Sequence, residues 1–173
     1  CKIIGELGYW IITREVDKFN IYKMDGQNPL SFDHAEEIGY TFSNDIFGKM
    51  VFSPDMNIMA VSYTNATINK IELYNFNRDI NYSGNRLDLQ SVIQLNESPG
   101  PIEFSPDGSK LYYYTGLGLN QIDLSNSNSN INIYNEIFDD GYVMKVGLRL
   151  GPDGYIYVNH TPPTATGGTV TSH

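Results

Sequence analysis

Apolar and polar residues alternate over short stretches of this chain, at the period of two that is typical of β-strands. Three stretches share one pattern, in which a short apolar strand leads into a turn and a second strand follows. They cover residues 51–61 (VFSPDMNIMAV), 102–112 (IEFSPDGSKLY) and 148–157 (LRLGPDGYIY). The pattern predicts a strand–turn–strand unit that occurs at least three times.

Further strands are predicted around these units. A third strand is expected over residues 68–76 and again over 119–124, and a fourth near 91–95 and 131–134. An earlier copy with a degenerate turn has its second strand over residues 7–13 and its third over 18–23. One helical turn is predicted over residues 33–38, and no longer stretch repeats at the helical period.

The turn residues explain why the chain reverses at these points. Proline in the second position fixes φ near about −65°, while Asp and Gly tolerate the remaining angles of the turn. We therefore predict a structural role for eight residues: Pro54, Asp55, Pro106, Asp107, Gly108, Pro152, Asp153 and Gly154.

The spacing of the turns indicates the architecture. They begin at Ser53, Ser105 and Gly151, which are 52 and 46 residues apart, and a repeat of about 40–50 residues is typical of β-propeller blades. We therefore predict an all-β chain of four-stranded antiparallel blades. The units are residues 1–45, 46–95, 96–142 and 143–160, followed by a linker or loop over 161–173.

Ring closure needs more blades than these. Closed propellers usually have about 4–8 blades, and this chain accounts for about three and a half. An incomplete ring exposes sheet faces and edges that promote aggregation. We therefore expect further blades of the same polypeptide, or another chain, to complete the ring.

Composition supports strands and excludes one class of partner. The chain has 13 Tyr, 8 Phe and 16 Gly, and aromatic residues with turn formers favour strands over helices. The net charge is −9, and the basic residues are scattered. Nucleic-acid binding needs clustered Lys and Arg, so we expect no nucleic-acid partner.

The single cysteine, Cys1, excludes a disulfide within the chain and a metal site of the CxxC type. We expect Cys1 to mark a cut in a longer chain, with a lipidated N-terminal residue as the alternative. No apolar run approaches the roughly 20 residues that span a bilayer, so no transmembrane segment is predicted.

The repeated motifs also resemble a known family. Residues 8–13 (GYWIIT), 18–23 (KFNIYK), the two FSPD turns and 148–158 (LRLGPDGYIYV) look like the propeller region of large surface proteins that gliding bacteria export by the type IX secretion system. The likeness covers nearly the whole chain up to Thr161. No C-terminal sorting domain occurs within residues 1–173, which fits our expectation that the chain is a fragment of a longer protein. The resemblance implies an extracellular or cell-surface module that binds or acts as a scaffold, without an enzymatic activity.

Candidate chemistry is sparse. His34, His160 and His173 lack the spacing of zinc ligands, and no nucleophile elbow of the G-x-S-x-G type occurs. Residues 139–141 (DDG) are interpreted as a solvated turn, with a calcium site as the alternative, and residues 116–118 (GLG) as a turn. We predict no catalytic residue, no metal site and no cofactor.

Tyrosines are the weak candidates for ligand binding. Most are expected to pack between blades. Three that lie near predicted loops could form a platform for a sugar or a protein: Tyr40, Tyr82 and Tyr142.

The leading functional hypothesis is therefore a non-enzymatic binding or scaffold module that contacts a protein or glycan at the cell surface. One alternative is an enzyme of the lactonase or hydrolase type, with charged residues that converge at the central channel. Its candidates are Glu72, Glu103, Asp123 and Arg149. A second alternative is a structural spacer in a surface filament.

Overall fold

The computed structural model describes residues 8–25, 29–39, 48–65, 67–125, 130–135 and 146–160. Within these ranges the regular elements are thirteen strands, which form four antiparallel sheets. No helix that could cross a membrane occurs in this described part of the chain.

Each sheet is a meander, in which strands that follow one another in sequence are also neighbours in space. The first sheet contains β1 (Gly8–Arg14), β2 (Phe19–Asp25) and β3 (Ser31–Glu36). The second contains β4 (Met50–Phe52), β5 (Ile58–Thr64), β6 (Asn69–Phe76) and β7 (Leu87–Gln94). The third contains β8 (Ile102–Phe104), β9 (Lys110–Thr115), β10 (Gly118–Asp123) and β11 (Asn130–Asn135). The fourth contains β12 (Val146–Leu150) and β13 (Ile156–His160).

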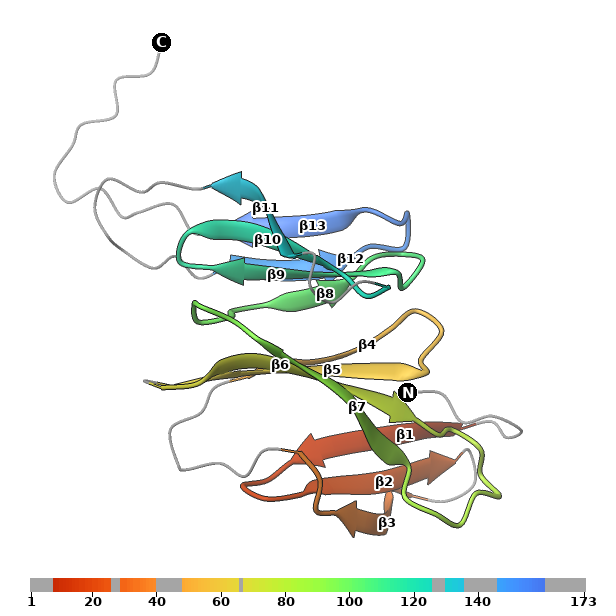
Figure 1. The fold of residues 1–173 in the computed structure, drawn as a ribbon. Coiled ribbons are helices and arrows are strands. Elements are labelled where there is room, and N and C mark those ends of the chain that lie inside the picture. Colours follow the sequence, from red (N-terminus) through yellow and green to blue (C-terminus); the bar gives the residue numbers. More distant parts are fainter. Residues whose placement is uncertain are drawn as a thin grey trace, which may run out of the picture.

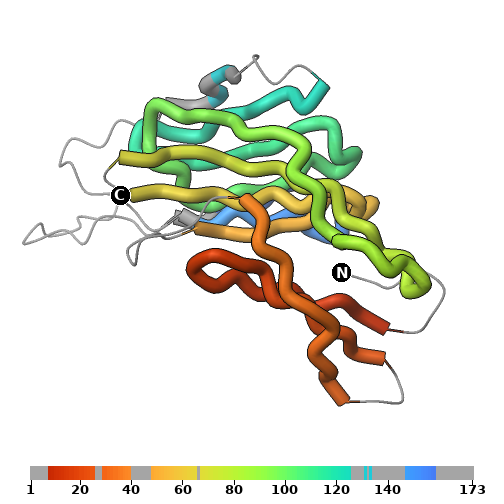
Figure 2. The backbone as a smooth tube through the Cα atoms, turned by 60° about the horizontal axis from the view of Figure 1, so that its bottom comes forward, coloured from red at the N-terminus to blue at the C-terminus, as the bar shows by residue number. Residues whose placement is uncertain are grey.

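The first, second and third sheets stack face to face in chain order, and β12 and β13 lie at the level of the third sheet in this view (Figure 1). The turned view shows the first sheet splayed away from the second, and the fourth sheet appears beside the second and third sheets (Figure 2). The short first strands of the sheets are neighbours, since β8 contacts β4 on one side and β12 on the other. Sheets that radiate from adjoining first strands are the blades of a β-propeller. The chain is thus an all-β partial propeller.

Two predicted elements differ from the structure. The helical turn predicted over residues 33–38 is wrong, because residues 31–36 form β3, which pairs with β2. The free edge of β2 offers backbone hydrogen bonds to this polar segment, and they outweigh its weak local preference. In the second blade the fourth strand begins at Leu87, earlier than the predicted start at residue 91.

Apolar side chains fill both layers around the second blade. Between the first and second blades, the buried core residues are Trp10, Phe19, Ile21, Met59, Val61, Tyr63, Tyr74, Phe76 and Leu87. Between the second and third blades they are Val51, Ala60, Ile71, Leu73, Ile93, Ile102, Phe104, Leu111, Tyr113 and Ile122. Because consecutive residues of a strand point to opposite faces, β5 and β6 are buried along nearly their whole length.

The first blade has one covered and one uncovered face. On the covered face Trp10 is 1% exposed, whereas its neighbour Tyr9 on the other face is 53% exposed. Tyr9 lies opposite Met24 across the β1–β2 ladder, and Met24 is also exposed. Phe32 of β3, 58% exposed, packs edge-on against Tyr22. The uncovered face therefore has the apolar character of a layer between blades.

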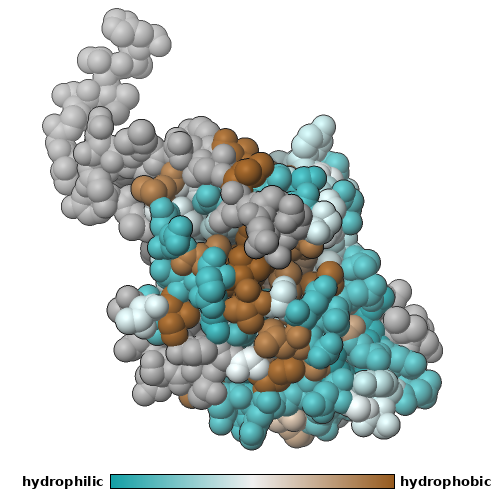
Figure 3. All heavy atoms as spheres, viewed as in Figure 1, coloured by the Kyte–Doolittle hydropathy of each residue, from teal (hydrophilic) through white to brown (hydrophobic). Residues whose placement is uncertain are grey.

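Apolar residues also reach the surface on outer strands. Figure 3 shows hydrophobic side chains over the second blade and near β11. Leu89 and Val92 of β7 and Ile131 and Ile133 of β11 are among the exposed residues. Single exposed apolar residues are normal on protein surfaces, so these residues indicate a missing partner less strongly than the uncovered face of the first blade does.

Arg86 joins the first two blades through a buried guanidinium group. This group lies 3.8 Å from the ring centroid of Trp10, a cation–π contact. Its Nε donates to Asp33 Oδ2 at 3.3 Å, and Nη1 donates to the carbonyl oxygens of Asn77 (3.3 Å) and Asp79 (2.8 Å). The side chain thus links β1 and β3 to the loop before β7.

Glu36 completes this junction. Its carboxylate is buried at the end of β3 and accepts the backbone N–H groups of Arg86 (2.5 Å) and Leu87 (2.9 Å). His34 Nε2 lies 2.6 Å from the same carboxylate, and His34 Nδ1 lies 2.7 Å from Asp33. The carboxylate therefore satisfies two backbone donors of the next blade.

The serine–proline–aspartate turns repeat one hydrogen-bond pattern. In the third blade Ser105 Oγ donates to Asp107 Oδ1 at 2.6 Å and accepts the backbone N–H of Lys110 at 2.9 Å. In the second blade Ser53 makes the same two bonds, to Asp55 (2.6 Å) and from Ile58 (3.0 Å). The hydroxyl thus connects the turn to the start of the following strand.

The fourth blade replaces the serine with a pair of residues. Gly151 occupies the serine position, and the Tyr157 hydroxyl donates to Asp153 Oδ2 at 2.5 Å. A Cβ atom at residue 151 would lie 2.4 Å from the Tyr157 ring. A side chain at residue 151 would therefore have to push aside the Tyr157 ring, which fills this space and supplies the hydroxyl.

Met56 is the strained residue of the first turn. Its φ is +60°, and the equivalent Gly108 and Gly154 have φ values of +72° and +81°. Residues with a Cβ atom rarely adopt this left-handed conformation, whereas glycine adopts it freely.

We predict that Met56→Gly raises the free energy of unfolding by about 0.5–1 kcal/mol, because the strain at φ +60° is relieved. Gly108→Ala is the matched control of opposite sign. Its Cβ would make only ordinary contact with Pro54 at 3.6 Å, so backbone strain alone should destabilise it by about 1 kcal/mol. Urea titration of both variants measures the two changes. A destabilised Met56→Gly would contradict the assignment of strain.

We also predict an acid-sensitive contribution from Asp107. The Ser105 hydroxyl, followed by the Ser109 backbone and side chain, lowers the pKa of Asp107 from 3.8 to about 2. A carboxyl group whose pKa is lower in the folded state stabilises the fold above its unfolded pKa, and the effect is lost as pH falls through the folded pKa. The melting temperature of Asp107→Asn should therefore lie below wild type at pH 7, and the gap should close between about pH 4 and 2. Asp88→Asn, at an exposed position on β7, is the control. A pH-independent gap for Asp107→Asn would contradict the prediction.

Candidate ligand-binding site

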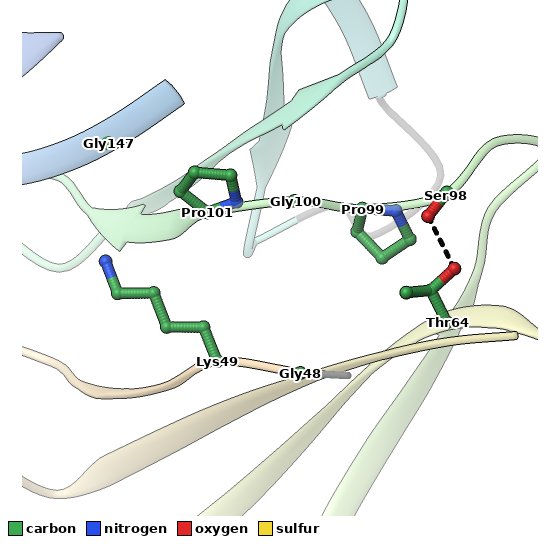
Figure 4. A pocket seen from close by; sticks show the side chains of 8 residues that line it. All are labelled: Gly48, Lys49, Thr64, Ser98, Pro99, Gly100, Pro101 and Gly147. Carbon is green, nitrogen blue, oxygen red and sulfur yellow. Dashed lines mark hydrogen bonds between the residues drawn. The ribbon is translucent and has the colours of Figure 1, made fainter. Parts of the chain in front are cut away.

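A pocket of about 470 Å³ opens at the start of the central strands, at the opposite end from the proline turns. We call it the mouth pocket (Figure 4). It is lined by Gly48, Lys49, Thr64, Ser98, Pro99, Gly100, Pro101 and Gly147. These residues come from the second, third and fourth blades, so the pocket exists only because the blades are assembled.

Lys49 is the cation of the mouth pocket. Its Nζ donates to the carbonyl oxygens of Ile102 and Leu148, both at 3.0 Å. The first of these carbonyls belongs to β8 and the second to β12, so one side chain joins three blades. Burial, the largest effect, lowers the pKa of Lys49; Glu103 opposes this shift and Arg149 adds to it.

Backbone contacts hold the segment that carries Lys49. Its N–H donates to Ser62 Oγ at 2.9 Å, and its carbonyl oxygen accepts the Ser62 N–H at 2.9 Å. Gly48 approaches the same strand so closely that a Cβ atom would lie 1.8 Å from the Ser62 carbonyl oxygen. A side chain at residue 48 would therefore displace the lysine from the pocket.

The loop before β8 forms the other wall. The N–H of Gly100 donates to the Tyr114 carbonyl oxygen at 2.7 Å. The N–H of Tyr114 donates in turn to the Pro101 carbonyl oxygen at 3.0 Å. Thr64 Oγ1 and Ser98 Oγ lie 2.5 Å apart and close the end of the pocket away from Lys49. The wall is therefore proline and backbone, with hydroxyl groups at one end.

A smaller cavity of about 260 Å³ adjoins the mouth pocket and shares Gly48 and Lys49 with it. Arg14 lines it from the first blade. The Arg14 guanidinium lies 4.2 Å from the Phe19 ring centroid, and its Nη1 donates to the Ile38 carbonyl oxygen at 3.2 Å. This cation is thus engaged in holding the first blade.

The structure brings together only two of the four charged residues considered for a central channel. Glu103 on β8 and Arg149 on β12 lie on neighbouring central strands, and the charges of both act on Lys49. Asp123 lies at the end of β10, the third strand of its blade, where it accepts hydrogen bonds from Ser125.

Glu72 lies away from the axis, on the third strand of the second blade. Its buried carboxylate accepts hydrogen bonds from Lys70 Nζ at 2.7 Å and from the Tyr74 hydroxyl. Burial opposes ionisation, yet the bonds from Lys70 and Tyr74 leave the pKa of Glu72 lowered. Burial also raises the pKa of the Tyr74 hydroxyl. The carboxylate is therefore committed to an ionic network between blades.

Among the tyrosine candidates, the structure places Tyr82 in the loop between β6 and β7, with its side chain 44% exposed. It lines neither of the two cavities described above. Tyr40 and Tyr142 lie outside the described residues, as do residues 139–141. Within the described residues, no group of three or more His, Cys, Asp or Glu side chains is placed to hold a metal ion.

Sequence reasoning missed Lys49 because the lysine is unique to one repeat. In the aligned repeats the equivalent residues are Pro101 and Gly147. A pattern that depends on recurrence cannot show a residue that occurs once. The sequence feature that could have indicated Lys49 is its position, because a charged residue stands there directly before an apolar central strand.

Comparison with known proteins supports the fold. A functionally unknown protein from Desulfotomaculum acetoxidans matches with a TM-score of 0.56 and 15% identity, over 87% of this chain and 43% of that chain. A candidate 6-phosphogluconolactonase from Bacteroides uniformis matches with a TM-score of 0.56 and 17% identity, over 86% of this chain and 43% of that chain. The β-propeller domain of Myceliophteria thermophila Cps50 (Swd1) gives a TM-score of 0.47 at 12% identity, over 75% and 43%.

The chain thus spans less than half the length of each of these three solved structures. At these identities the likeness concerns the fold alone. No protein-family model matches the chain, and no curated protein matches it in sequence.

We predict that Lys49→Met lowers the free energy of unfolding by about 1–3 kcal/mol, because two hydrogen bonds from a charged donor to neighbouring blades are lost. Lys18→Met is the control, since Lys18 pairs with Glu15 at 3.3 Å on the surface and such pairs contribute at most about 1 kcal/mol. Urea titration compares the two variants. Equal stability of Lys49→Met and wild type would show that the lysine does not hold the blades together.

Proposed function

We propose that the chain is a non-enzymatic binding or scaffold module of an extracellular or cell-surface protein, built on a β-propeller. The mouth pocket carries this proposal. Its volume of about 470 Å³ lies within the roughly 300–1,000 Å³ of small-molecule sites. Its lining combines one cation and two hydroxyl groups with proline rings and backbone, which suits recognition.

The charged groups near the pocket support binding over catalysis. General acid–base chemistry needs a titratable group within reach of the substrate. Glu103, whose charge acts on Lys49, is 6% exposed, and Lys49 already donates to two backbone carbonyls. Glu103 is thus withdrawn from solvent, and Lys49 mainly connects blades.

The cellular setting is part of the same proposal. The motifs that resemble the propeller region of proteins exported by the type IX secretion system favour a surface location, with a protein or glycan as the partner. The uncovered face of the first blade, where Tyr9 and Phe32 are more than half exposed, favours further blades of the same ring as a second kind of partner.

The rival from another class is an enzyme of the lactonase type. The observation that favours it is the convergence of Lys49, Glu103 and Arg149 near the axis, together with the likeness to a candidate 6-phosphogluconolactonase. A purely structural spacer in a surface filament is the remaining alternative, and it differs in retaining no ligand.

We predict that the immobilised chain retains a glycan from an array or a protein from a surface extract, and that Ser98→Trp abolishes the retention by filling the mouth pocket. Gln90→Trp, on the exposed outer strand β7, should retain the ligand as wild type does. Absence of any retention would favour the spacer. Hydrolysis of 6-phosphogluconolactone above the buffer rate, lost in Ser98→Trp, would establish the enzyme instead.

A further inference from the structure

Lys49 retains hydrogen-bonding capacity after its structural contacts are counted. An ammonium group has three N–H donors and no acceptor. Two of them go to the carbonyl oxygens of Ile102 and Leu148. One donor therefore remains for a group that enters the mouth pocket, which Lys49 lines.

Counted over the residues that the structure describes, the charge around this donor is positive, in contrast to the chain as a whole. Within them, Glu103 and Arg149 are the charged groups that act on Lys49, one attractive and one repulsive. One carboxylate against two cations leaves a local excess of positive charge, while the chain carries −9. An anion in the pocket would balance this excess at short range.

Partial burial adds to the preference for an anion. The Lys49 side chain is half-buried, and burial is the main cause of its lowered pKa. A cation that has lost part of its water is stabilised when an anionic oxygen replaces that water. The site is thus better suited to an anion than an exposed lysine is.

The rest of the pocket suits a sugar ring. The Thr64 and Ser98 hydroxyl groups lie at the end opposite Lys49 (Figure 4). Thr64 donates its proton to Asn69 Oδ1 at 2.9 Å, so Ser98 donates to Thr64, and the pair offers lone pairs that accept hydrogen bonds from ligand hydroxyl groups. Between these ends, Pro99 and Pro101 present apolar ring surfaces. A ligand with an acidic group at one end, hydroxyl groups at the other and C–H surfaces between them would match all three features.

We propose that the mouth pocket binds a sugar acid, whose anionic oxygen group accepts a hydrogen bond from Lys49 and whose hydroxyl groups contact Thr64 and Ser98. This inference rests on the binding role proposed above and names the ligand class. The recognised chemistry is an anionic oxygen, which a carboxylate or a phosphate can supply.

The experiment compares three probes by NMR titration of the isotope-labelled chain. They are glucuronate, its neutral counterpart glucose, and inorganic phosphate. Glucuronate should shift the amide signals of Lys49 and Gly100 and bind at least about tenfold more tightly than glucose, because a hydrogen bond to a charged group is at stake. Inorganic phosphate that shifts the same amide signals, and does so only when Lys49 is present, would support the anion site. It would also show that a phosphate group can supply the anionic oxygen.

Variants separate binding from folding. Lys49→Met should abolish the preference for glucuronate over glucose, and Lys49→Arg should keep it, because a guanidinium retains charge and donors. Lys110→Met is the matched control, since Lys110 lies beside the proline turn at the other end of the third blade. It should bind as wild type does. If Lys49→Met does not fold, Lys49→Arg and the probe comparison on wild type still decide the question.

Two results would overturn the inference. Equal affinity for glucuronate and glucose would remove the anionic requirement while leaving the proposed binding role intact. Amide shifts confined to residues outside the mouth pocket would remove the site. Failure of the proposed function itself has a different signature, namely that neither glycans nor proteins are retained in the capture experiment.

Discussion

Burial of both faces of a sheet by its neighbours is the constraint on which this structure depends. A blade whose strands are apolar on both sides cannot be stable in water by itself, because each uncovered face leaves a large apolar area exposed. The second blade meets the constraint, with Met59 packed toward the first blade and Ala60 toward the third, both fully buried. The first blade meets it on one side only. Stability in this fold is therefore a property of neighbouring pairs.

Cationic side chains that bind backbone carbonyl oxygens fix the positions of the packed blades. Arg86 reaches the first blade through the Asp33 carboxylate and the Trp10 ring, and it donates to carbonyl oxygens of its own loop. Lys49 instead donates directly to carbonyl oxygens of the third and fourth blades. Carbonyl acceptors occur at every residue, so such a contact needs no matching acidic side chain in the neighbouring repeat. A single substitution can thus connect diverged blades. The same property explains why Lys49 is both a structural link and the cation of a pocket.

The fold could be predicted from the sequence because its repeats are local. The proline turns and the alternation around them place the first and second strands of each blade. The outer strands were harder to place. The polar segment 31–36 becomes a strand because it pairs with β2 and because Glu36 accepts the backbone N–H groups of Arg86 and Leu87. The last two partners lie 50 and 51 residues away in sequence. The pocket was out of reach for a similar reason, since its walls come from three blades and its cation occurs in one repeat only.

The exchange at the fourth turn shows how a repeat protein diverges without losing its geometry. Ser105 and Ser53 supply a hydroxyl from within the turn, whereas Gly151 leaves room for the Tyr157 hydroxyl to reach Asp153. Restoring serine at residue 151 would collide with the tyrosine ring, and removing the tyrosine would leave the aspartate without its hydroxyl donor. The two positions are thus epistatic. A change at one of them alone sets the new side chain and the ring in competition for one space, whereas a joint change returns to the arrangement of the other turns.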